Sequence, residues 1–227
     1  MKALFVTGTD TGCGKTRLGV TLAGAARRQG LRVRVLKPIE TGCVESAGER
    51  RAADAESLAR AARDDRRIDA ICPYRLLLPA SPLVAARAEG LHIDLVAIEK
   101  AFEQARDEAD LVIVEGAGGL RVPISPTLDM AGLAQHLGLP LLVVARAALG
   151  TYNHTQLTLE AATARGLPIL GVVVSHTTPD LSAADRSNLD GLLADLPVPL
   201  LGELAYGAQD LVPPVDTAAL LGMIEPA

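Results

Sequence analysis

Short apolar runs alternate with longer amphipathic segments along this 227-residue chain. Such short apolar runs are typical of strands buried on both faces of a sheet, and apolar residues at a helical spacing predict helices that cover it. The predicted strands are residues 3–7, 32–36, 111–115, 140–144, 169–174 and 199–201. The predicted helices are residues 16–28, 53–63, 95–106, 130–137, 154–164, 183–194 and 217–223. This alternation predicts an α/β fold of three layers, with a mostly parallel central sheet between two layers of helices.

Local signals support several of these boundaries. Four side chains can cap helix N-termini, namely Asp94, Asp129, Ser182 and Asp216. Residues 47–67 carry many charges of both signs, which predicts a solvent-exposed helix face. Residues 71–82 contain three prolines and are predicted to form an irregular excursion that carries substrate groups.

The strongest chemical signal follows the first predicted strand, where a glycine-rich loop leads into a helix. Residues 8–16 read Gly-Thr-Asp-Thr-Gly-Cys-Gly-Lys-Thr. The backbone N–H groups of such a loop and the positive end of the helix dipole bind the phosphates of a nucleotide. Lys15 can reach the β- and γ-phosphates, and Thr16 can offer its hydroxyl to Mg²⁺. The loop is one residue longer than the usual pattern, and the alternative is an ordinary glycine-rich turn.

A second signal is the acid that closes the third predicted strand. Glu115 is followed by Gly116-Ala117-Gly118-Gly119, which lets the backbone approach a ligand closely. An acid at the carboxyl edge of a parallel sheet commonly holds Mg²⁺ in nucleotide-dependent enzymes. Glu115 is therefore a candidate metal ligand, and the alternative is a solvated acid at the end of a strand.

A third signal is Lys37, which opens the sequence Lys-Pro-Ile-Glu-Thr-Gly after the second predicted strand. The chain prefers arginine and keeps lysine only at Lys2, Lys15, Lys37 and Lys100. Because Lys37 lies at the same sheet edge as the phosphate loop, we expect its compact ammonium to bind a second anion beside the γ-phosphate, with a hydroxyl from Thr41.

The turn over residues 150–153 precedes a predicted helix, and the N-terminus of that helix suits a carboxylate. The sequence around Asp54 shows no motif, so this residue is interpreted as a charge on the protein surface.

Composition narrows the class of protein. The length fits one large α/β domain over residues 1–227, and a net charge of −5 without blocks of like charge argues against a nucleic-acid partner. No apolar run is long enough to span a bilayer, and no room is left for a cleaved signal peptide, so we expect no membrane partner. Three cysteines without metal-ligand spacing indicate a reducing cytoplasm. Cys13, inside the loop, is either a small residue tolerated in a tight turn or a site where oxidation blocks nucleotide binding.

In their order along the chain these motifs resemble those of the dethiobiotin synthetases. The residues that carry the resemblance are 6–11 leading into Gly14-Lys15-Thr16, then Lys37-Pro38, residues 114–119, and Leu149-Gly150 with Asn153-His154. The resemblance covers nearly the whole chain. It implies a cytoplasmic homodimer of P-loop NTPase-type domains that uses ATP and Mg²⁺ to join 7,8-diaminononanoate and CO₂ (or bicarbonate) into the cyclic urea dethiobiotin. It also implies a carbamate, then a carbamic–phosphoric anhydride, and release of ADP and phosphate.

The resemblance also assigns roles to residues. The catalytic residues would be Lys37, Lys15 and Thr11, and the metal ligands Thr16, Asp54 and Glu115. The nucleotide would contact Gly12, Cys13, Gly14, Lys15, Thr16, Arg17, Asp54, Glu115, Gly116, Ala117, Gly118, Ser175, His176, Leu204, Ala205 and Tyr206. The diamine would contact Thr41, Ser81, Gly150, Thr151, Tyr152 and Asn153, the last four supplied by the partner subunit to bind the distal carboxylate.

Three positions depart from the pattern of the family. Gly12 replaces a common glutamate, Thr41 replaces a serine but keeps the hydroxyl, and Ser175-His176 replaces an Asn-Asp pair that reads adenine. An amide matches both a donor and an acceptor on a base edge, and Ser and His do so less completely. The sequence therefore predicts that other nucleoside triphosphates also serve, with Tyr206 available to stack on the base.

Two other classes of protein share such motifs. Amide-forming ligases such as the cobyrinate amidases have a similar nucleotide domain but generally carry an added glutaminase domain, which this chain is too short to contain. Switch ATPases of the partition or septum-site type usually have a further lysine near the start of the loop and a basic amphipathic tail. Here the loop starts with Thr9-Asp10 and the C-terminus is acidic or neutral.

Overall fold

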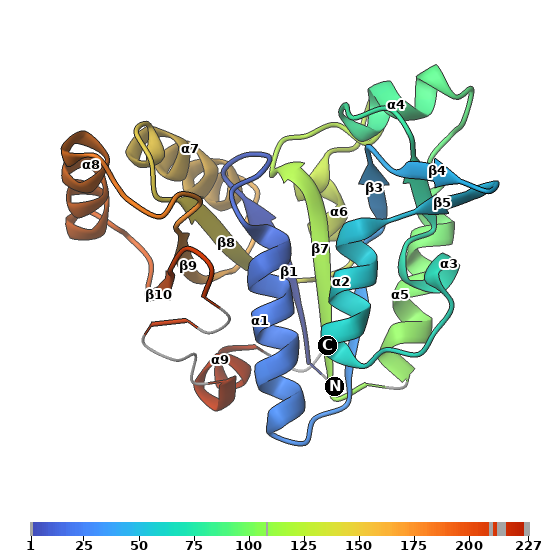
Figure 1. Cartoon of the computed structure of the whole chain (residues 1–227), viewed down its shortest axis with the longest axis horizontal. Coiled ribbons are helices and arrows are strands. Elements are labelled where there is room, and N and C mark those ends of the chain that lie inside the picture. Colours follow the sequence, from blue (N-terminus) through green and yellow to red (C-terminus); the bar gives the residue numbers. More distant parts are fainter. Residues whose placement is uncertain (1, 108, 209–210, 213–216, 225–227) are drawn as a thin grey trace.

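The centre of the molecule is a six-stranded parallel sheet, seen in a computed structural model that describes residues 2–107, 109–208, 211–212 and 217–224 (Figure 1). The strands lie in the order β10-β9-β8-β1-β7-β2, and every neighbouring pair is parallel. They are β1 (Lys2–Gly8), β2 (Val33–Leu36), β7 (Leu111–Gly119), β8 (Leu141–Arg146), β9 (Ile169–Ser175) and β10 (Leu200–Leu204). Each predicted strand is therefore confirmed as a member of this sheet.

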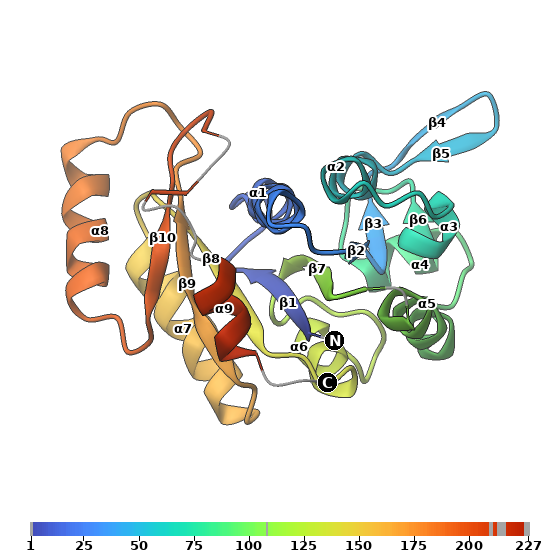
Figure 2. The same cartoon turned by 90° about the horizontal axis from the view of Figure 1, so that it is seen from below.

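Alternate residues of the strands pack into two separate cores. In β1, Ala3 and Phe5 join one core, while Leu4 and Val6 join the other. The first core is covered by α5 (Leu95–Asp107), α6 (Met130–His136) and α7 (Thr151–Ala164), and the second by α1 (Lys15–Arg28), α2 (Ala53–Ala62) and α9 (Thr217–Met223). Figure 2 shows α1 and α2 on one side of the sheet and α5, α6 and α7 on the other. This confirms the predicted three-layer α/β fold.

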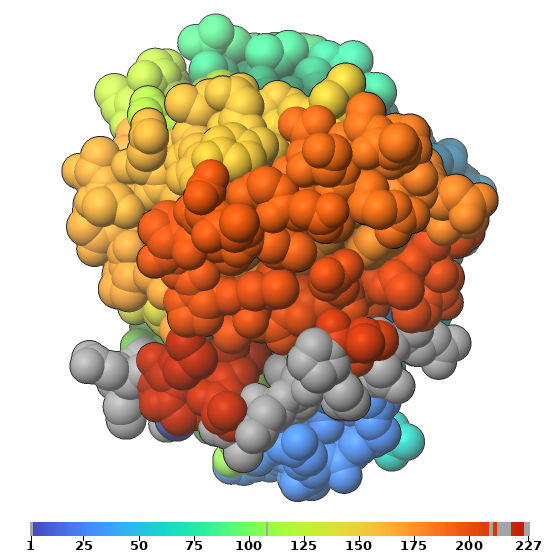
Figure 3. Space-filling model, turned by 90° about the vertical axis from the view of Figure 1, so that its left-hand side faces the viewer, coloured from blue at the N-terminus to red at the C-terminus, as the bar shows by residue number. Residues whose placement is uncertain are grey.

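Helix α8 (Ala183–Ala194) extends the molecule beyond the sheet. It packs against α7, and the two helices form one continuous surface at that end of the molecule (Figure 3). A small apolar cluster of Ala147, Val174 and Leu189 joins α8 to the ends of β8 and β9. Within the described ranges, no helix combines the length and the apolar character needed to cross a bilayer.

The segment between β2 and α5 is more regular than the sequence predicts. Strand β3 (Ile39–Thr41) pairs in parallel with β6 (Tyr74–Leu76), and β4 (Val44–Ser46) forms a projecting hairpin with β5 (Glu49–Arg51) (Figure 1). Two short helices follow in this region, α3 (Ile68–Ile71) and α4 (Pro82–Ala88). The irregular excursion predicted for residues 71–82 therefore holds a strand and the start of a helix. Pro82 occupies the first turn of α4, where its missing N–H costs no hydrogen bond.

Three of the predicted helix caps are confirmed, and the start of one helix is corrected. The side chains of Asp94, Asp129 and Ser182 accept hydrogen bonds from backbone N–H groups in the first turns of α5, α6 and α8. Asp216 lies outside the described residues. Helix α7 begins at Thr151 rather than residue 154, because Gly150 takes a left-handed conformation with φ 89° and ends the preceding turn.

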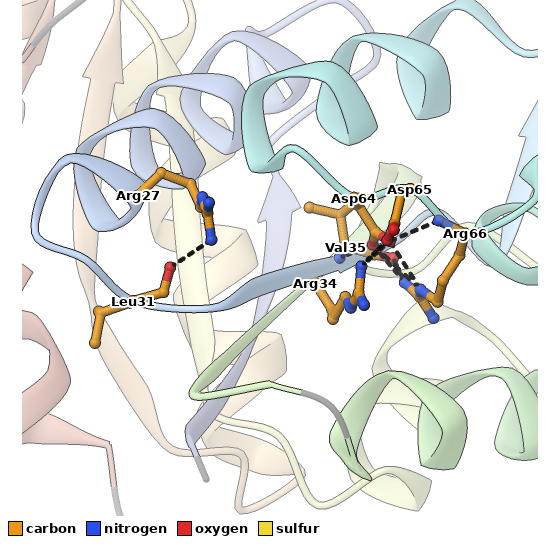
Figure 4. Close-up of polar contacts among 7 residues, drawn as sticks. All are labelled: Arg27, Leu31, Arg34, Val35, Asp64, Asp65 and Arg66. Atoms are coloured by element: carbon orange, nitrogen blue, oxygen red, sulfur yellow. Dashed lines mark hydrogen bonds and ion pairs between the residues drawn. The ribbon is translucent and has the colours of Figure 1, made fainter.

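Strand β2 is an edge strand of the sheet, and side chains bond to its backbone on the side away from β7. The N–H of Val35 donates to Asp64 Oδ2 at 3.1 Å, and Arg66 Nη2 donates to the carbonyl of Val35 at 2.7 Å. The fully buried carboxylate of Asp64 also pairs with Arg34 at 2.8 Å and with Arg66 at 2.7 Å (Figure 4). These charges were predicted to lie on a solvated helix face. They are instead drawn inward, because the outermost strand needs hydrogen-bond partners for its backbone.

Candidate active site

A cavity of about 600 Å³ lies toward the carboxyl ends of β1, β2 and β7. Its walls come from the glycine-rich loop, the segment after β2, the start of α2, the turn before α4 and the second half of β7. The predicted site residues that line it are Thr11, Gly12, Gly14, Lys15, Thr16, Arg17, Lys37, Thr41, Asp54, Ser81, Glu115, Ala117 and Gly118. The fold thus brings together the three motifs that are far apart in the sequence.

Glycine is required at several points of the loop that leads into α1. Gly12 and Gly14 have positive φ angles of 72° and 105°, a region that other residues rarely adopt. A Cβ on Gly8 would lie 2.3 Å from the Sγ of Cys13. The thiol of Cys13 is fully buried and belongs to the core between the sheet and α1, so this residue offers only its backbone to a ligand. Its placement supports the interpretation of Cys13 as a small packing residue.

Lys15 lies in the first turn of α1 with its side chain folded over the loop. Its Nζ donates to the carbonyl of Asp10 at 3.0 Å, and the residue is 6% exposed. Burial lowers the pKa of Lys15, and the nearby charge of Lys37 acts in the same direction. A weakly solvated ammonium at this place interacts strongly with an anion that enters the loop.

Lys37 lies between two carboxylates in the same cavity. Its Nζ bonds to Asp54 Oδ2 at 3.1 Å and forms a close ion pair with Glu115 Oε1. Burial alone would lower the pKa of Lys37, but the two carboxylates outweigh burial and raise it. Burial alone would raise the pKa of Asp54, but the charge and hydrogen bond of Lys37 lower it. Lys37 is therefore held as an ammonium.

The oxygen atoms around Lys37 suit a small divalent cation. The hydroxyl of Thr16 donates to Glu115 Oε1 at 2.8 Å, and the buried Oε2 of Glu115 has no hydrogen-bond partner in the part of the chain that the structure describes. Asp54 is 44% exposed at the side chain and faces the cavity. Among the described residues, no three His, Cys, Asp or Glu side chains gather as a ligand set of their own. This pattern fits Mg²⁺, which usually takes one or two carboxylates and completes its shell with phosphates and water.

Glu115 lies within its strand rather than at the end that was predicted. Strand β7 continues to Gly119, and Gly8 of β1 still pairs with Gly119 after a register shift. The two backbones lie close together at this pair, where a Cβ on Gly119 would lie 3.4 Å from the carbonyl oxygen of Gly8. Gly116 lies in this strand but does not line the cavity.

The residues predicted to hold the base form a separate group beside α1 and do not line the cavity. Ser175 is fully buried, and a Cβ on Gly14 would lie 2.2 Å from its Oγ. The imidazole of His176 hydrogen-bonds through Nε2 to Glu203 Oε2 at 2.7 Å. Leu204 is buried in the second core, whereas Tyr206 is 57% exposed. Of these side chains, that of Tyr206 is the most open to a ligand.

Arg17 links this group to the phosphate loop. Its guanidinium donates to the carbonyl of His176 at 2.9 Å and to the carbonyl of Ala205 at 2.7 Å. The two carbonyls belong to segments that follow β9 and β10, which are neighbouring strands. One side chain of the first turn of α1 therefore holds both base-side segments.

The residues predicted to bind a carboxylate, 150–153, lie at the start of α7 and do not line the cavity of the same chain. The N–H of Leu149 donates to Asp185 Oδ1 at 2.6 Å, and the hydroxyl of Tyr152 donates to Asp195 Oδ2 at 2.6 Å. Thr151 is buried, and its hydroxyl has no hydrogen-bond partner. Helix α8 thus fixes the start of α7 from the outside.

Sequence reasoning did not single out Glu40, which also lines the cavity. Its carboxylate accepts hydrogen bonds from the backbone N–H groups of Asp54 and Ala55, each at 3.0 Å. A signal was present in the sequence: the residue before α2 is Ala52, which has no side chain that can cap a helix.

The first strand of the parallel sheet leads through the glycine-rich loop to Lys15 and Thr16 at the start of α1. This arrangement defines a P-loop protein that binds a nucleoside triphosphate. Residues 2–213 match a family model described as an AAA domain. Solved structures with this fold include the chloroplast FtsY of Physcomitrella patens (TM-score 0.54, 16% identity, 99% of this chain and 65% of that one). The FtsY of Thermotoga maritima is similar (TM-score 0.52, 20% identity, 98% and 67%).

Curated relatives identify the family within this class. The chain is 49% identical to the ATP-dependent dethiobiotin synthetase BioD of Anaeromyxobacter dehalogenans strain 2CP-C, over 83% of this chain and 86% of that protein. It is 42% identical to the protein of the same name from Aromatoleum aromaticum, over 91% and 92%. The chain belongs to the dethiobiotin synthetase family.

Proposed function

We propose that this protein catalyses the ATP- and Mg²⁺-dependent carboxylation and ring closure of 7,8-diaminononanoate with CO₂, giving dethiobiotin, ADP and phosphate. The relatives are named ATP-dependent dethiobiotin synthetases, which supports the use of ATP and the product. The observation that carries the proposal is Lys37, a second buried ammonium that lines the same cavity as Lys15. Two ammonium groups at one site suit a reaction that brings two anions together, here a carbamate and a triphosphate.

In the first step one amine of the substrate attacks the carbon of CO₂. A new N–C bond forms, the nitrogen loses a proton to solvent, and a carbamate anion results. Lys37 holds this anion, with the hydroxyls of Thr11 and Thr41, which line the same cavity. Ser81, on the turn before α4, lines the same cavity and contacts the diamine.

In the second step a carbamate oxygen attacks the γ-phosphorus of ATP, and the bond from that phosphorus to ADP breaks. Lys15 and the backbone N–H groups of Gly12, Cys13 and Gly14 hold the phosphates, while Lys37 keeps the carbamate in line. Thr16, Asp54 and Glu115 would hold Mg²⁺, which supplies positive charge to the phosphate oxygens. Most of the rate enhancement comes from this alignment of two anions that otherwise repel each other.

In the third step the second amine attacks the carbonyl carbon of the carbamic–phosphoric anhydride. A second N–C bond closes the ring, the bond from carbon to the phosphate oxygen breaks, and the nitrogen loses a proton. The products are the cyclic urea and inorganic phosphate. The base-side group of Ser175, His176, Leu204, Ala205 and Tyr206 accepts adenine but also other bases, so other nucleoside triphosphates can replace ATP.

The active form is a homodimer in the cytoplasm, in which residues 1–227 of each chain form one domain. Each cavity is completed by the start of α7 of the partner subunit, whose backbone binds the distal carboxylate of the diamine. This arrangement is supported by residues 150–153, which lie away from the cavity of their own chain. Three buried free thiols are compatible with a reducing compartment.

One incubation tests the reaction. Purified protein is mixed with the diamine, labelled bicarbonate, Mg²⁺ and ATP, and the products are separated by chromatography. Label in a cyclic urea, with one phosphate released per urea formed, is expected. Release of phosphate that does not depend on the diamine, with no labelled urea, would overturn the proposal in favour of an ATPase.

Complementation tests the shared cavity. Lys37→Met removes the carbamate site, and Gly150→Asp places a negative charge where the carboxylate binds. Each variant alone is expected to be inactive, and a mixed dimer regains one intact site. An inactive mixture of the two folded variants, after subunit exchange has been verified, contradicts a site built from two subunits.

A further inference from the structure

The carboxylate of Glu40 holds the start of helix α2 from another segment of the chain. Oε1 accepts the N–H of Asp54 and Oε2 accepts the N–H of Ala55, each at 3.0 Å. Glu40 lies on β3 and is only 7% exposed. Both of its oxygen atoms are therefore engaged by backbone groups at a place where water has little access.

These two hydrogen bonds replace a cap that the helix lacks. The first N–H groups of a helix have no partner within it, and a Ser, Thr, Asp or Asn at the N-cap usually accepts from the second or third helical residue. The N-cap of α2 is Ala52, which has no such side chain. Asp54 and Ala55 are the second and third residues of the helix, and Glu40 accepts from both.

The same contacts connect the first turn of α2 to the segment that carries Lys37. Lys37 lies three residues before Glu40, and its ammonium bonds to the side chain of Asp54 at 3.1 Å. The main chain from 37 to 40, the carboxylate of Glu40 and the first turn of α2 thus form a loop that is closed by the pair of Lys37 with Asp54. Without Glu40 the first turn of α2 would lose this tie to β3, and its position relative to Lys37 would depend on the half-exposed side chain of Asp54 and on the packing of α2 against α1 and β2.

We infer that Glu40 is a positioning residue that fixes Asp54 against Lys37, and so sets the oxygen atom that Asp54 presents to the cation bound with the nucleotide. Glu40 acts through Asp54 and does not itself contact the reacting atoms, because both of its oxygen atoms bond to backbone N–H groups. The inference rests on the proposed function for the identity of the cation, Mg²⁺. The tether between Glu40 and α2 is independent of that identity.

The test separates capping of the helix from positioning of Asp54. Glu40→Ala removes the cap and the tether together. The double variant Glu40→Ala/Ala52→Ser restores a cap of the ordinary kind, because a serine hydroxyl at the N-cap can accept from Ala55, but it leaves Asp54 untied from the Lys37 segment. Asp94→Ala is the matched control: it removes a cap from α5, where Asp94 Oδ1 accepts from Val96 at 2.9 Å, at a residue that does not line the cavity.

Two quantities are measured on each variant. Isothermal titration with a non-hydrolysable ATP analogue, with and without Mg²⁺, gives the gain in affinity that the cation provides. Amide hydrogen exchange of Asp54 and Ala55 in the ligand-free protein, followed by NMR, reports whether the two N–H groups are still bonded, whatever the activity. The midpoint of thermal unfolding shows that each variant is folded.

In Glu40→Ala we expect faster exchange at Asp54 and Ala55 and a loss of about 10- to 100-fold in the Mg²⁺-dependent affinity, the usual effect of removing a group that orients a metal ligand. Affinity without Mg²⁺ should change little. The double variant should recover the unfolding midpoint and the exchange at Ala55, but not the Mg²⁺-dependent gain. Asp94→Ala should lower the unfolding midpoint alone.

Full recovery, in the double variant, of the gain in nucleotide affinity that Mg²⁺ provides would overturn the inference, since Glu40 would then be only a helix cap. An unchanged gain in affinity in Glu40→Ala would overturn it as well. If Glu40→Ala does not fold, Glu40→Gln takes its place: the amide NH₂ group replaces one of the two carboxylate oxygens and cannot accept, so one backbone N–H loses its acceptor. An unchanged gain in affinity with faster exchange at one amide would be equally contrary. A wild-type protein that binds the Mg²⁺ nucleotide but forms no labelled urea would refute the proposed function and leave this test intact.

Discussion

The ammonium of Lys37 and the carboxylate of Glu115 form an ion pair with side-chain exposures of only 4% and 0%. Burying two charges costs more free energy than their attraction returns unless further hydrogen bonds satisfy them. Here Asp54 and Thr16 supply such bonds. An apolar pair of similar volume would fill the space at lower cost, so the pair is best explained by function.

Replacement of Lys37 by methionine should nearly abolish dethiobiotin synthesis and leave nucleotide affinity within a few-fold of the wild type. The reason is that Lys37 follows β2, outside the phosphate loop, and would bind the carbamate rather than the nucleotide. Single-turnover synthesis and titration with ATP measure the two effects. Lys100→Met, at an exposed lysine, is the control. An equal loss of nucleotide binding would assign Lys37 to the nucleotide instead.

Base choice is predicted to be relaxed. Ser175 is buried against Gly14 and His176 is engaged with Glu203, so neither side chain offers the paired donor and acceptor of an amide. We expect kcat/KM for CTP and GTP to fall within roughly tenfold of that for ATP, measured at saturating diamine. A site built to bond one base edge discriminates by about 10⁴, and a preference of that size for ATP would rule the prediction out.

Arg17→Ala should raise KM for the nucleotide with little change in kcat. The variant loses two charge-assisted hydrogen bonds, to the carbonyls of His176 and Ala205, and frees two segments of the base-side group. Initial-rate kinetics at varied nucleotide measure the effect. Arg17→Lys keeps the charge but lacks the planar fork that reaches both carbonyls. If Arg17→Lys kept the wild-type KM for the nucleotide, the positive charge at this position would matter and the pair of hydrogen bonds to the two carbonyls would not.

Acid should destabilise the protein partly through Asp64. Burial alone would raise the pKa of this carboxyl, but its hydrogen bonds and charge interactions with Arg66, together with the N–H of Val35, lower it below the usual value of 3.8. A lowered pKa means that the stabilisation is present above the ordinary pKa of an aspartate and is lost as the pH falls through the lowered value. Urea unfolding between neutral pH and about pH 3 measures this loss.

Asp64→Asn should lower the free energy of unfolding at neutral pH by about 3–5 kcal/mol, the usual cost of breaking a buried pair from one side, and should flatten its acid dependence. Asp65→Asn is the matched control, because Asp65 also pairs with Arg34 but its side chain is 87% exposed. An Asp64→Asn protein with the wild-type acid dependence would show that the network does not control it.

The three thiols should resist alkylation in the native protein. Cys13, Cys43 and Cys72 are buried, and burial raises the pKa of Cys43 to about 11, so little reactive thiolate forms near neutral pH. Iodoacetamide followed by mass spectrometry should find no label in the folded protein and label at all three cysteines after unfolding. Rapid labelling of Cys13 in the folded state would restore the alternative of an oxidation-sensitive loop.

The sequence was sufficient for the central sheet, the seven predicted helices and the motifs, because each is a local pattern whose partners are implied by the fold class, but it did not predict α3, α4 or the short strands between β2 and α5. Lys15, Lys37 and Glu115 could be assigned to one edge of the sheet since parallel strands place their carboxyl ends together. Asp54 and Glu40 could not be found in this way. Their importance depends on how the chain returns after a hairpin, and no local pattern encodes that path.

The same limit applies to the base-side group and explains the error in the charged segment. Ser175 was assigned to the base by the resemblance to the family, which stays a prediction, and the sequence did not show that its hydroxyl lies close to Gly14 of the phosphate loop. Asp64 and Arg66 looked like solvated charges because nothing in their own segment shows that Val35 lacks partners on its outer side. Both cases depend on contacts between residues far apart in the sequence.

The coverage of Val35 by Asp64 and Arg66 has a consequence for assembly. At the opposite margin, Glu203 of β10 exchanges both backbone hydrogen bonds with Val212, at 2.9 and 2.8 Å. Neither outer strand therefore presents a long free ladder to a second molecule. Two copies of the chain cannot readily associate by merging their sheets into one, so a twofold pairing has to be made through helices and loops, and the same blunted margins protect a crowded solution from fibre growth.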